Sequence, residues 1–221
     1  MAADTLIVAI VGAESTGKTV LAQTLAARIE AETGLVCAWV PEHLRSWCET
    51  RGRTPRADEQ AAIARAQRDT IEAAAAAADV VVADTTPLMT AVYSRLLFGD
   101  DTLDAEACAW QRERCGATLL TALDLPWVAD GLQRDGPQVR IPVDTTLREL
   151  MARHGLAWAL VCGYGDERLE NALDALAPLL RERAAPRRGL FTRLAGRDAA
   201  DRPWRCELCD DPACEHAARR G

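Results

Sequence analysis

Short, uninterrupted apolar runs recur along the chain and are separated by longer mixed segments. The runs cover residues 5–11 (TLIVAIV), 35–40 (LVCAWV), 79–83 (DVVVA), 118–123 (TLLTAL) and 157–161 (AWALV). A run of this length without polar alternation is typical of a strand that is covered on both faces. We therefore predict five buried strands.

Apolar residues with a helical spacing fill the segments between these runs. In residues 18–32, for example, Leu21, Leu25 and Ile29 recur at intervals of four, which places them on one face of a helix. Further helices are predicted at residues 58–78, 86–98, 104–115, 145–153 and 166–183. Because strands that alternate with helices form parallel βαβ units, the sequence predicts an α/β fold. The expected architecture is a three-layer α/β/α sandwich around a five-stranded parallel sheet.

Length and composition narrow the class of protein. The 221 residues fit one α/β domain with a short appendage, and 49% of them are hydrophobic, enough for a sizeable core. The net charge of −7 argues against nucleic-acid binding, which relies on clustered basic residues. The first apolar run is too short for a signal peptide or a membrane span, and no basic segment precedes it. We expect a soluble, cytoplasmic protein that binds neither nucleic acid nor membrane.

A complete phosphate-binding motif follows the first predicted strand and opens the first predicted helix. Residues 12–19 (GAESTGKT) match G-x-x-x-x-G-K-[ST], a loop whose backbone N–H groups surround phosphates. Lys18 is placed to reach the β- and γ-phosphates of ATP, and the Thr19 hydroxyl to ligate Mg²⁺. The alternative is a glycine-rich turn that merely caps a helix. The predicted nucleotide-binding residues are Gly12, Ala13, Glu14, Ser15, Thr16, Gly17, Lys18 and Thr19.

Two carboxylates stand where predicted strands end. Asp84 ends the third strand and Glu42 follows the second, and ligands of open α/β sheets bind at the carboxyl ends of the strands. Asp84 is a candidate ligand of Mg²⁺, and either carboxylate is a candidate base for an acceptor hydroxyl. Both are also candidate substrate contacts. The alternative for each is a residue that caps the next helix.

Two tryptophans and a basic loop complete the candidate site. Trp47 and Trp127 are expected in loops, where they either stack on a nucleoside or pack in the core, whereas Trp39 is expected in the core. Residues 130–142 are rich in Gly, Pro and Arg and predict a lid. Its Arg134 and Arg140 either steady the transferring phosphoryl group or are solvated on the surface.

The motif GAESTGKT, the following Val20-Leu21, the strand end Asp84-Thr85 and PWVADG at residues 126–131 together resemble the kinase domain of NadR-type proteins. The resemblance covers residues 5–182. It implies a P-loop kinase of the nucleoside and nucleotide kinase type, which uses ATP to phosphorylate the 5′ hydroxyl of ribosylnicotinamide in NAD biosynthesis. It also implies that Trp127 and Asp130 contact the substrate. Thr86 differs from the family, which often has a second aspartate there.

Other activities fit the same motifs. Residues 42–47 resemble the segment of deoxynucleoside kinases in which an acid is the base, so another nucleoside is an alternative acceptor. A P-loop ATPase or a regulatory switch that acts on a protein partner is the alternative from another class. A kinase consumes ATP only when a small acceptor is present, whereas an ATPase or switch uses water or a protein partner.

The composition shifts to Arg, Pro and Gly near residue 184, which predicts a domain at residues 1–183 and a C-terminal tail at 184–221. Four potential metal ligands lie within eleven residues of the tail: Cys206, Cys209, Cys214 and His216. Thiolate and imidazole donors suit tetrahedral Zn²⁺, and a short tail with little apolar surface would gain order from a metal. One residue between Cys214 and His216 is tighter than common zinc motifs, so reduced, packed cysteines are the alternative to a structural zinc site.

Overall fold

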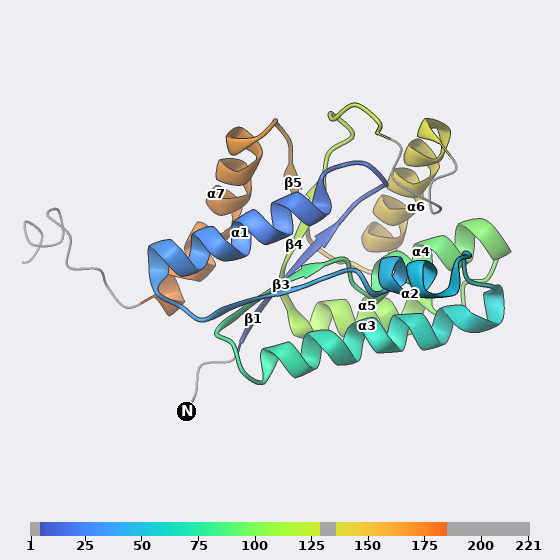
Figure 1. Ribbon diagram of the computed structural model, residues 1–221, viewed down its shortest axis with the longest axis horizontal. Coiled ribbons are helices and arrows are strands. Elements are labelled where there is room, and N and C mark those ends of the chain that lie inside the picture. The colour runs from blue at the N-terminus through green and yellow to red at the C-terminus, as the bar shows by residue number, and fades with distance from the viewer. Residues whose placement is uncertain (1–4, 129–135, 185–221) are drawn as a thin grey trace, which may run out of the picture. The chain divides into compact units, whose positions relative to one another are not determined.

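Five parallel strands form a single sheet at the centre of the fold (Figure 1). The computed structural model describes residues 5–128 and 136–184. The sheet has the order β2-β3-β1-β4-β5, so β1 is central and β2 and β5 are the edges. The strands are β1 (Leu6–Val11), β2 (Cys37–Val40), β3 (Val80–Asp84), β4 (Cys115–Thr121) and β5 (Ala159–Val161).

Helices cover both faces of the sheet, as the predicted three-layer sandwich requires. In Figure 1, α1 and α7 lie on one face, α3, α4 and α5 lie on the other, and α6 packs against α4. None of the helices in the described ranges is long and apolar enough to cross a membrane. The helices are α1 (Lys18–Thr33), α2 (His43–Arg51), α3 (Gln60–Ala75), α4 (Pro87–Phe98), α5 (Asp104–Arg114), α6 (Arg140–Arg153) and α7 (Asp166–Arg183), with 3₁₀ turns at Ala57–Glu59 and Pro137–Val139.

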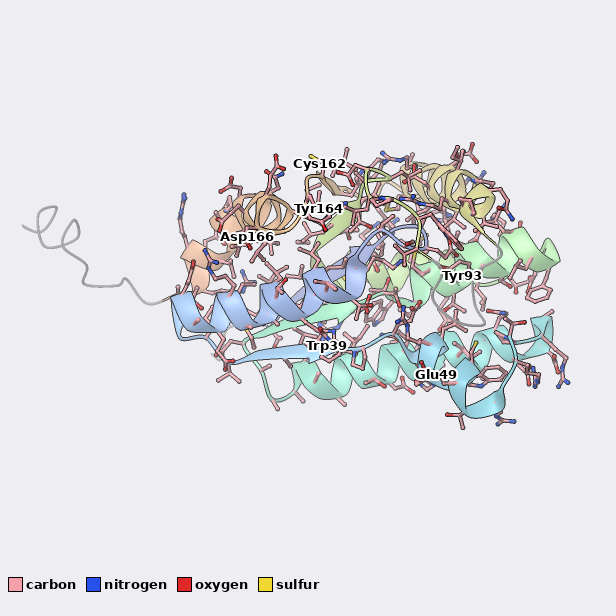
Figure 2. All side chains as sticks on the ribbon, turned by 45° about the horizontal axis from the view of Figure 1, so that its top comes forward. Trp39, Glu49, Tyr93, Cys162, Tyr164 and Asp166 are labelled. Carbon is pink, nitrogen blue, oxygen red and sulfur yellow. The ribbon has the colours of Figure 1, made fainter. Side chains whose placement is uncertain are left out.

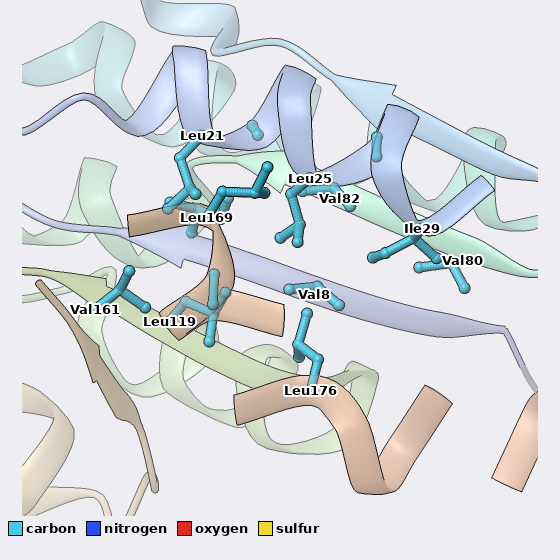
Figure 3. Close-up of a cluster of buried hydrophobic side chains, with 14 of the residues drawn as sticks. Val8, Leu21, Leu25, Ile29, Val80, Val82, Leu119, Val161, Leu169 and Leu176 are labelled. Carbon is cyan, nitrogen blue, oxygen red and sulfur yellow. The ribbon is translucent and has the colours of Figure 1, made fainter. Parts of the chain in front are cut away.

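The two faces of β1 explain why its sequence shows no polar alternation. Val8 packs between the side chains of α1 and α7, among them Leu25 and Leu176 (Figure 3). The neighbouring Ile7 points to the opposite face, where it packs with Ile71 of α3. Both faces of this central strand are therefore buried, and each such aliphatic side chain contributes about 1.5–3 kcal/mol by leaving water.

All five predicted strands are present, but several of them begin at other residues than predicted. β4 begins at Cys115, three residues before its predicted start, and β2 and β5 each lose two residues at their beginnings. Trp39 of β2 was expected in the core and this is wrong, because 37% of its surface is exposed at the edge of the sheet (Figure 2). An edge strand is covered less completely than a central one, and the apolar run alone does not reveal which strand lies at an edge.

Two helices were not anticipated in their observed form. Residues 43–51 form α2, in which Cys48 alone is buried, so Trp47 lies on a helix and not in the expected loop. The helix predicted at 145–153 begins at Arg140. Pro142 lies in its first turn, where a proline removes no helical hydrogen bond. Asp144, which precedes the predicted helix, is consequently inside the observed one, where it accepts a hydrogen bond from Arg148 Nε at 2.7 Å.

The last three residues of the predicted lid, 140–142, therefore belong to α6. Asp130 and Arg134 lie outside the described residues. The same is true of the predicted zinc ligands Cys206, Cys209, Cys214 and His216. Their proposed roles remain predictions from the sequence.

Candidate active site

The chain between β1 and α1 forms a tight loop that only glycine permits at two positions. Gly12 has φ 149° and Gly17 has φ 77°, values that side chains rarely adopt. A Cβ atom on Gly12 would also lie 2.1 Å from Thr121 Oγ1 at the end of β4. The loop is thus pressed against the neighbouring strand end, and its glycines are needed for both conformation and space.

Polar side chains of the loop fold back onto its own backbone. The Lys18 ammonium donates to the carbonyl of Ala13 at 2.8 Å. The Thr16 hydroxyl donates to the same carbonyl at 2.8 Å and lies 2.7 Å from the Thr121 hydroxyl. These bonds close the loop around the start of α1, where N–H groups and the helix dipole favour an anion. The geometry fits a phosphate cradle and does not fit a simple capping turn.

Thr19 and Asp84 meet at the edge of the cradle. The Thr19 hydroxyl donates to Asp84 Oδ2 at 2.5 Å, although 65 residues separate the two. Asp84 is almost fully buried, and its other oxygen, Oδ1, has no hydrogen-bond partner within the described part of the chain. Burial raises the pKa of Asp84, while the bond from Thr19 and the charges of Lys18 and Arg45 act in the opposite direction. A hydroxyl and a partly unsatisfied carboxylate are the hard oxygen donors that suit Mg²⁺.

A cavity of about 440 Å³ opens beside the phosphate loop. Glu14 and Lys18 of the loop contribute to its wall together with Glu42 and Arg45 at the start of α2. Tyr93 of α4 (Figure 2) and Gln60 of α3 add further polar groups. The remaining lining residues are Leu44, Cys48, Thr54, Pro55, Leu96, Leu97, Gln138, Val139, Pro142 and Val143. A mostly apolar cavity with a few convergent polar groups is typical of a small-molecule site.

Glu42 stands at the N-cap position of α2, yet its side chain makes no capping hydrogen bond. The carboxylate faces the cavity instead, so the helix-capping alternative does not hold for this residue. Burial is the largest influence on Glu42 and raises its pKa. Lys18 and Arg45 lower the pKa, whereas Asp84 and Glu14 raise it further. A carboxylate with a raised pKa is suited to accept a proton near neutral pH.

Gln67 of α3 connects the segments that carry the two carboxylates, and the sequence analysis missed it. Its side-chain oxygen accepts a hydrogen bond from the His43 N–H at 2.6 Å. Its amide nitrogen donates to the carbonyls of Pro41 at 3.3 Å and Thr85 at 3.4 Å. The available signal was a polar residue four positions from both Ile63 and Ile71, on the buried face of the helix.

Trp47 and Arg140 occupy different surroundings from those expected, whereas Trp127 lies in a loop as predicted. Trp47 stacks against Arg51 and Arg53, whose guanidinium carbons lie 5.5 and 5.0 Å from the ring centre, and it does not line the cavity. Trp127 is half-buried and does not line the cavity either. Arg140 is buried and donates to the Leu125 carbonyl at 2.8 Å. Its Nε and Nη2 have no hydrogen-bond partner among the described residues, so Arg140 is not a solvated loop arginine.

The strand order, the phosphate loop after β1 and the carboxylate at the end of β3 define a P-loop protein with a kinase-like α/β fold. A sequence profile of the family described as an AAA domain matches residues 7–168. The chain therefore belongs to this family. A comparison with curated protein sequences gives no match.

Solved structures share the fold. A crystal structure of NadR protein in complex with NR has 21% sequence identity and a TM-score of 0.65, and NadR protein in complex with NAD and AMP-PNP has 18% and 0.60. Each match covers 79% of this chain and 50% of the NadR chain, so the chain spans about half the length of these relatives. Thymidylate kinase from Ehrlichia chaffeensis has 12% identity and a TM-score of 0.57, with coverage of 80% and 100%. The fold predicted from the sequence is confirmed.

Proposed function

We propose that this protein is an ATP- and Mg²⁺-dependent kinase that phosphorylates the 5′ hydroxyl of ribosylnicotinamide. The observation that carries the proposal is that Lys18 of the phosphate loop and Glu42 of α2 line one cavity. A phosphoryl donor on the loop and an acceptor in the cavity would thus be neighbours. Phosphoryl transfer depends mainly on such positioning and on charge stabilisation.

The two carboxylates have separate roles in this proposal. Asp84 is engaged by Thr19, and the pair would hold Mg²⁺, which shields the charge of the phosphates when bound. Glu42 makes no capping bond and faces the cavity, so it would accept the proton of the acceptor hydroxyl. The ammonium of Lys18 would neutralise charge on the transferring group. Arg140 would add a second positive charge from the start of α6, where two of its nitrogens have no partner in the described residues.

The acceptor is proposed from two independent considerations. The PWVADG sequence at residues 126–131 and the phosphate loop resemble NadR-type kinase domains, and a solved NadR structure contains NR. The cavity of about 440 Å³ falls within the range of small-molecule pockets, roughly 300–1,000 Å³. Another nucleoside remains the alternative acceptor, and the resemblance of residues 42–47 to deoxynucleoside kinases favours testing it.

Acceptor-dependent turnover tests the proposal. Purified protein with ATP, Mg²⁺ and ribosylnicotinamide should release ADP, and mass spectrometry should show the acceptor gaining one phosphate. Lys18→Ala should lower turnover by about 10²-fold or more, because it removes a charge aimed at the transferring group. Exchange of the exposed Arg153 for Ala on α6 is the matched control for loss of one positive charge and should leave turnover unchanged.

The other outcomes separate the alternatives. Phosphorylation of only a different nucleoside would keep the kinase assignment and reject ribosylnicotinamide. ADP release that needs no small acceptor would favour an ATPase or a switch with a protein partner. Normal turnover by folded Lys18→Ala protein would contradict the role given to the phosphate loop.

A further inference from the structure

The carboxamide of Gln67 makes three hydrogen bonds, all to backbone atoms of two other segments. Two of them go to the residues on either side of Glu42: the carbonyl of Pro41 accepts from Gln67, and the N–H of His43 donates to it. The third goes to the carbonyl of Thr85, the residue after Asp84. The side chain is 2% exposed, so water does not compete for these bonds.

The turn after Asp84 needs such support. Thr85 has φ 68°, a left-handed conformation that a β-branched residue rarely adopts and that persists only where the surroundings hold it. Its N–H donates to the Ile10 carbonyl of β1 at 3.1 Å, and its carbonyl accepts from Gln67. The backbone of Thr85 is therefore held at both of its polar groups, the N–H by β1 and the carbonyl by α3.

Gln67 also supports the first turn of α2. The first N–H groups of a helix have no partner within the helix, and a side chain at the N-cap usually satisfies one of them. Here Glu42 occupies the N-cap without bonding to the helix, and Gln67 of α3 accepts from the N–H of His43. Gln67 of α3 thus satisfies one of the N–H groups that a helix leaves without a partner, and the carboxylate of Glu42 remains directed to the cavity.

We infer that Gln67 is a positioning residue, whose carboxamide holds the segment that carries Glu42 in a fixed place relative to the strand end that carries Asp84. This inference rests on the proposed function, in which both carboxylates act on one transfer. Gln67 itself does not line the cavity. Its effect on turnover is therefore through Glu42 and Asp84 and not through contact with a substrate.

A second buried glutamine provides a matched control. Gln111 of α5 is also almost fully buried. It accepts from the Thr86 hydroxyl at 2.8 Å and donates to the Thr118 hydroxyl at 2.9 Å. It therefore bridges two parts of the fold through a carboxamide, as Gln67 does, but neither bond involves the backbone beside Glu42.

The experiment compares Gln67→Met and Gln111→Met, which keep the side-chain size and remove the hydrogen bonds. Both should lower the melting temperature. Gln67→Met alone should lower kcat, by about 10- to 100-fold, because a displacement on the order of 1 Å at the reacting groups costs this much. KM for ATP should stay near the wild-type value, since the phosphate loop is untouched.

Amide hydrogen exchange of His43 provides a measurement that needs no substrate. In the folded wild-type protein its N–H is bonded to Gln67 and should be protected. Exchange should accelerate in Gln67→Met and stay slow in Gln111→Met. Gln67→Glu keeps the acceptor for His43 and loses both donors, so it should retain protection while kcat falls.

Unchanged exchange of His43 in Gln67→Met would overturn the inference, as would an equal loss of kcat in Gln111→Met. Failure of the proposed function is distinguishable, because the wild-type protein would then lack acceptor-dependent ADP release. In that case His43 exchange alone decides whether Gln67 holds the segment.

Discussion

Glu42 and Asp84 are carboxylates at neighbouring strand ends that differ in their hydrogen bonds. Asp84 is almost fully buried and Glu42 is partly buried in the cavity wall, and loss of water raises the pKa of each. Asp84 accepts a hydrogen bond from Thr19, which favours its charged form. Glu42 has no such bond at the helix it precedes. The pKa of both carboxyl groups is therefore raised, but the hydrogen bond from Thr19 opposes the rise at Asp84 and no capping hydrogen bond opposes it at Glu42.

Glu42→Gln should lower kcat by about 10²–10⁴-fold, the usual contribution of a general base. In the wild-type protein, kcat/KM should fall as the pH drops through the raised pKa of Glu42, because only the ionised carboxylate accepts a proton. This acidic limb should lie above the ordinary glutamate value of 4.5. In the residual activity of the variant the contribution of Glu42 to this limb should be absent, which leaves only the titration of Asp84.

Glu42→Gln should lose activity but gain stability at neutral pH. A carboxyl group whose pKa is raised by folding binds its proton more tightly in the folded state, so its ionisation destabilises the protein as the pH rises above 4.5. Glu42→Gln should therefore melt at a higher temperature than the wild type at pH 7 and not at pH 4. Glu49→Gln, on the exposed side of α2 (Figure 2), should change neither activity nor melting temperature. A destabilised Glu42→Gln protein with full activity would contradict both roles.

The sequence was sufficient to place residues that belong to a local motif and insufficient for those that depend on distant partners. The positions of residues 12–19 after β1 and of Asp84 at the end of β3 could be predicted because strand ends and motif spacing are local properties, while their chemical roles stay predictions. The role of Gln67 could not, because its partners lie 18–26 positions away along the chain. Trp47 was misplaced because its stacking on Arg51 and Arg53 required knowledge of α2.

At the scale of elements, the strongly periodic segments were predicted well and the polar ones poorly. α7 has the predicted bounds, Asp166–Arg183, because its apolar face repeats through five turns. α2 was missed because it is short, follows a proline and buries one cysteine. Its helical state depends on packing against α3, which single-sequence propensity does not contain.

The connection from α2 to α3 carries cavity residues Thr54 and Pro55 and is fastened by Glu59. The carboxylate of Glu59 accepts from both terminal nitrogens of Arg53 at 2.7 Å and from the backbone N–H of Arg56 at 2.8 Å. These bonds lower the pKa of Glu59 to about 2. A paired guanidinium and a backbone donor both favour the ionised carboxylate.

Glu59→Gln should lower the urea midpoint of unfolding at pH 7. Because folding lowers this pKa, the stabilisation is fully present above the ordinary value of 4.5 and is lost as the pH falls towards about 2. The difference between variant and wild type should therefore shrink between pH 5 and pH 3. Glu106→Gln is the control, since Glu106 pairs with Arg68 on the surface and exposed pairs contribute little. An equal difference at every pH would show that the carboxylate charge is not involved.

At the scale of the whole molecule, the candidate site joins residues that are distant in sequence at one edge of the sheet. Thr16 contacts Thr121, 105 residues away, and Thr19 contacts Asp84. The parallel register that pairs Ile10 with Asp84 and Val11 with Leu120 brings these strand ends together. The topology was predictable from alternating strands and helices, but the register and the resulting contacts were not, because they depend on packing between layers.

A ligand that bridges these strand ends should stabilise the described domain as a unit. A nucleotide bound only by the folded state, at about 100 times its Kd, adds about 2.7 kcal/mol. For a chain of this size that corresponds to a rise in melting temperature of roughly 5–10 °C. We predict this rise for the Mg²⁺ complex of AMP-PNP, measured by differential scanning calorimetry.

Lys18 permits a direct check that the stabilisation arises at the phosphate loop. It is the only lysine in the chain, so an amine-acylating reagent should modify one internal site, and the nucleotide should protect that site. Lys18→Ala should lose most of the rise in melting temperature because the ammonium no longer faces the phosphates, whereas Arg153→Ala on α6 should keep it. A full rise in Lys18→Ala, together with unprotected acylation of the wild-type protein, would place nucleotide binding elsewhere than the phosphate loop.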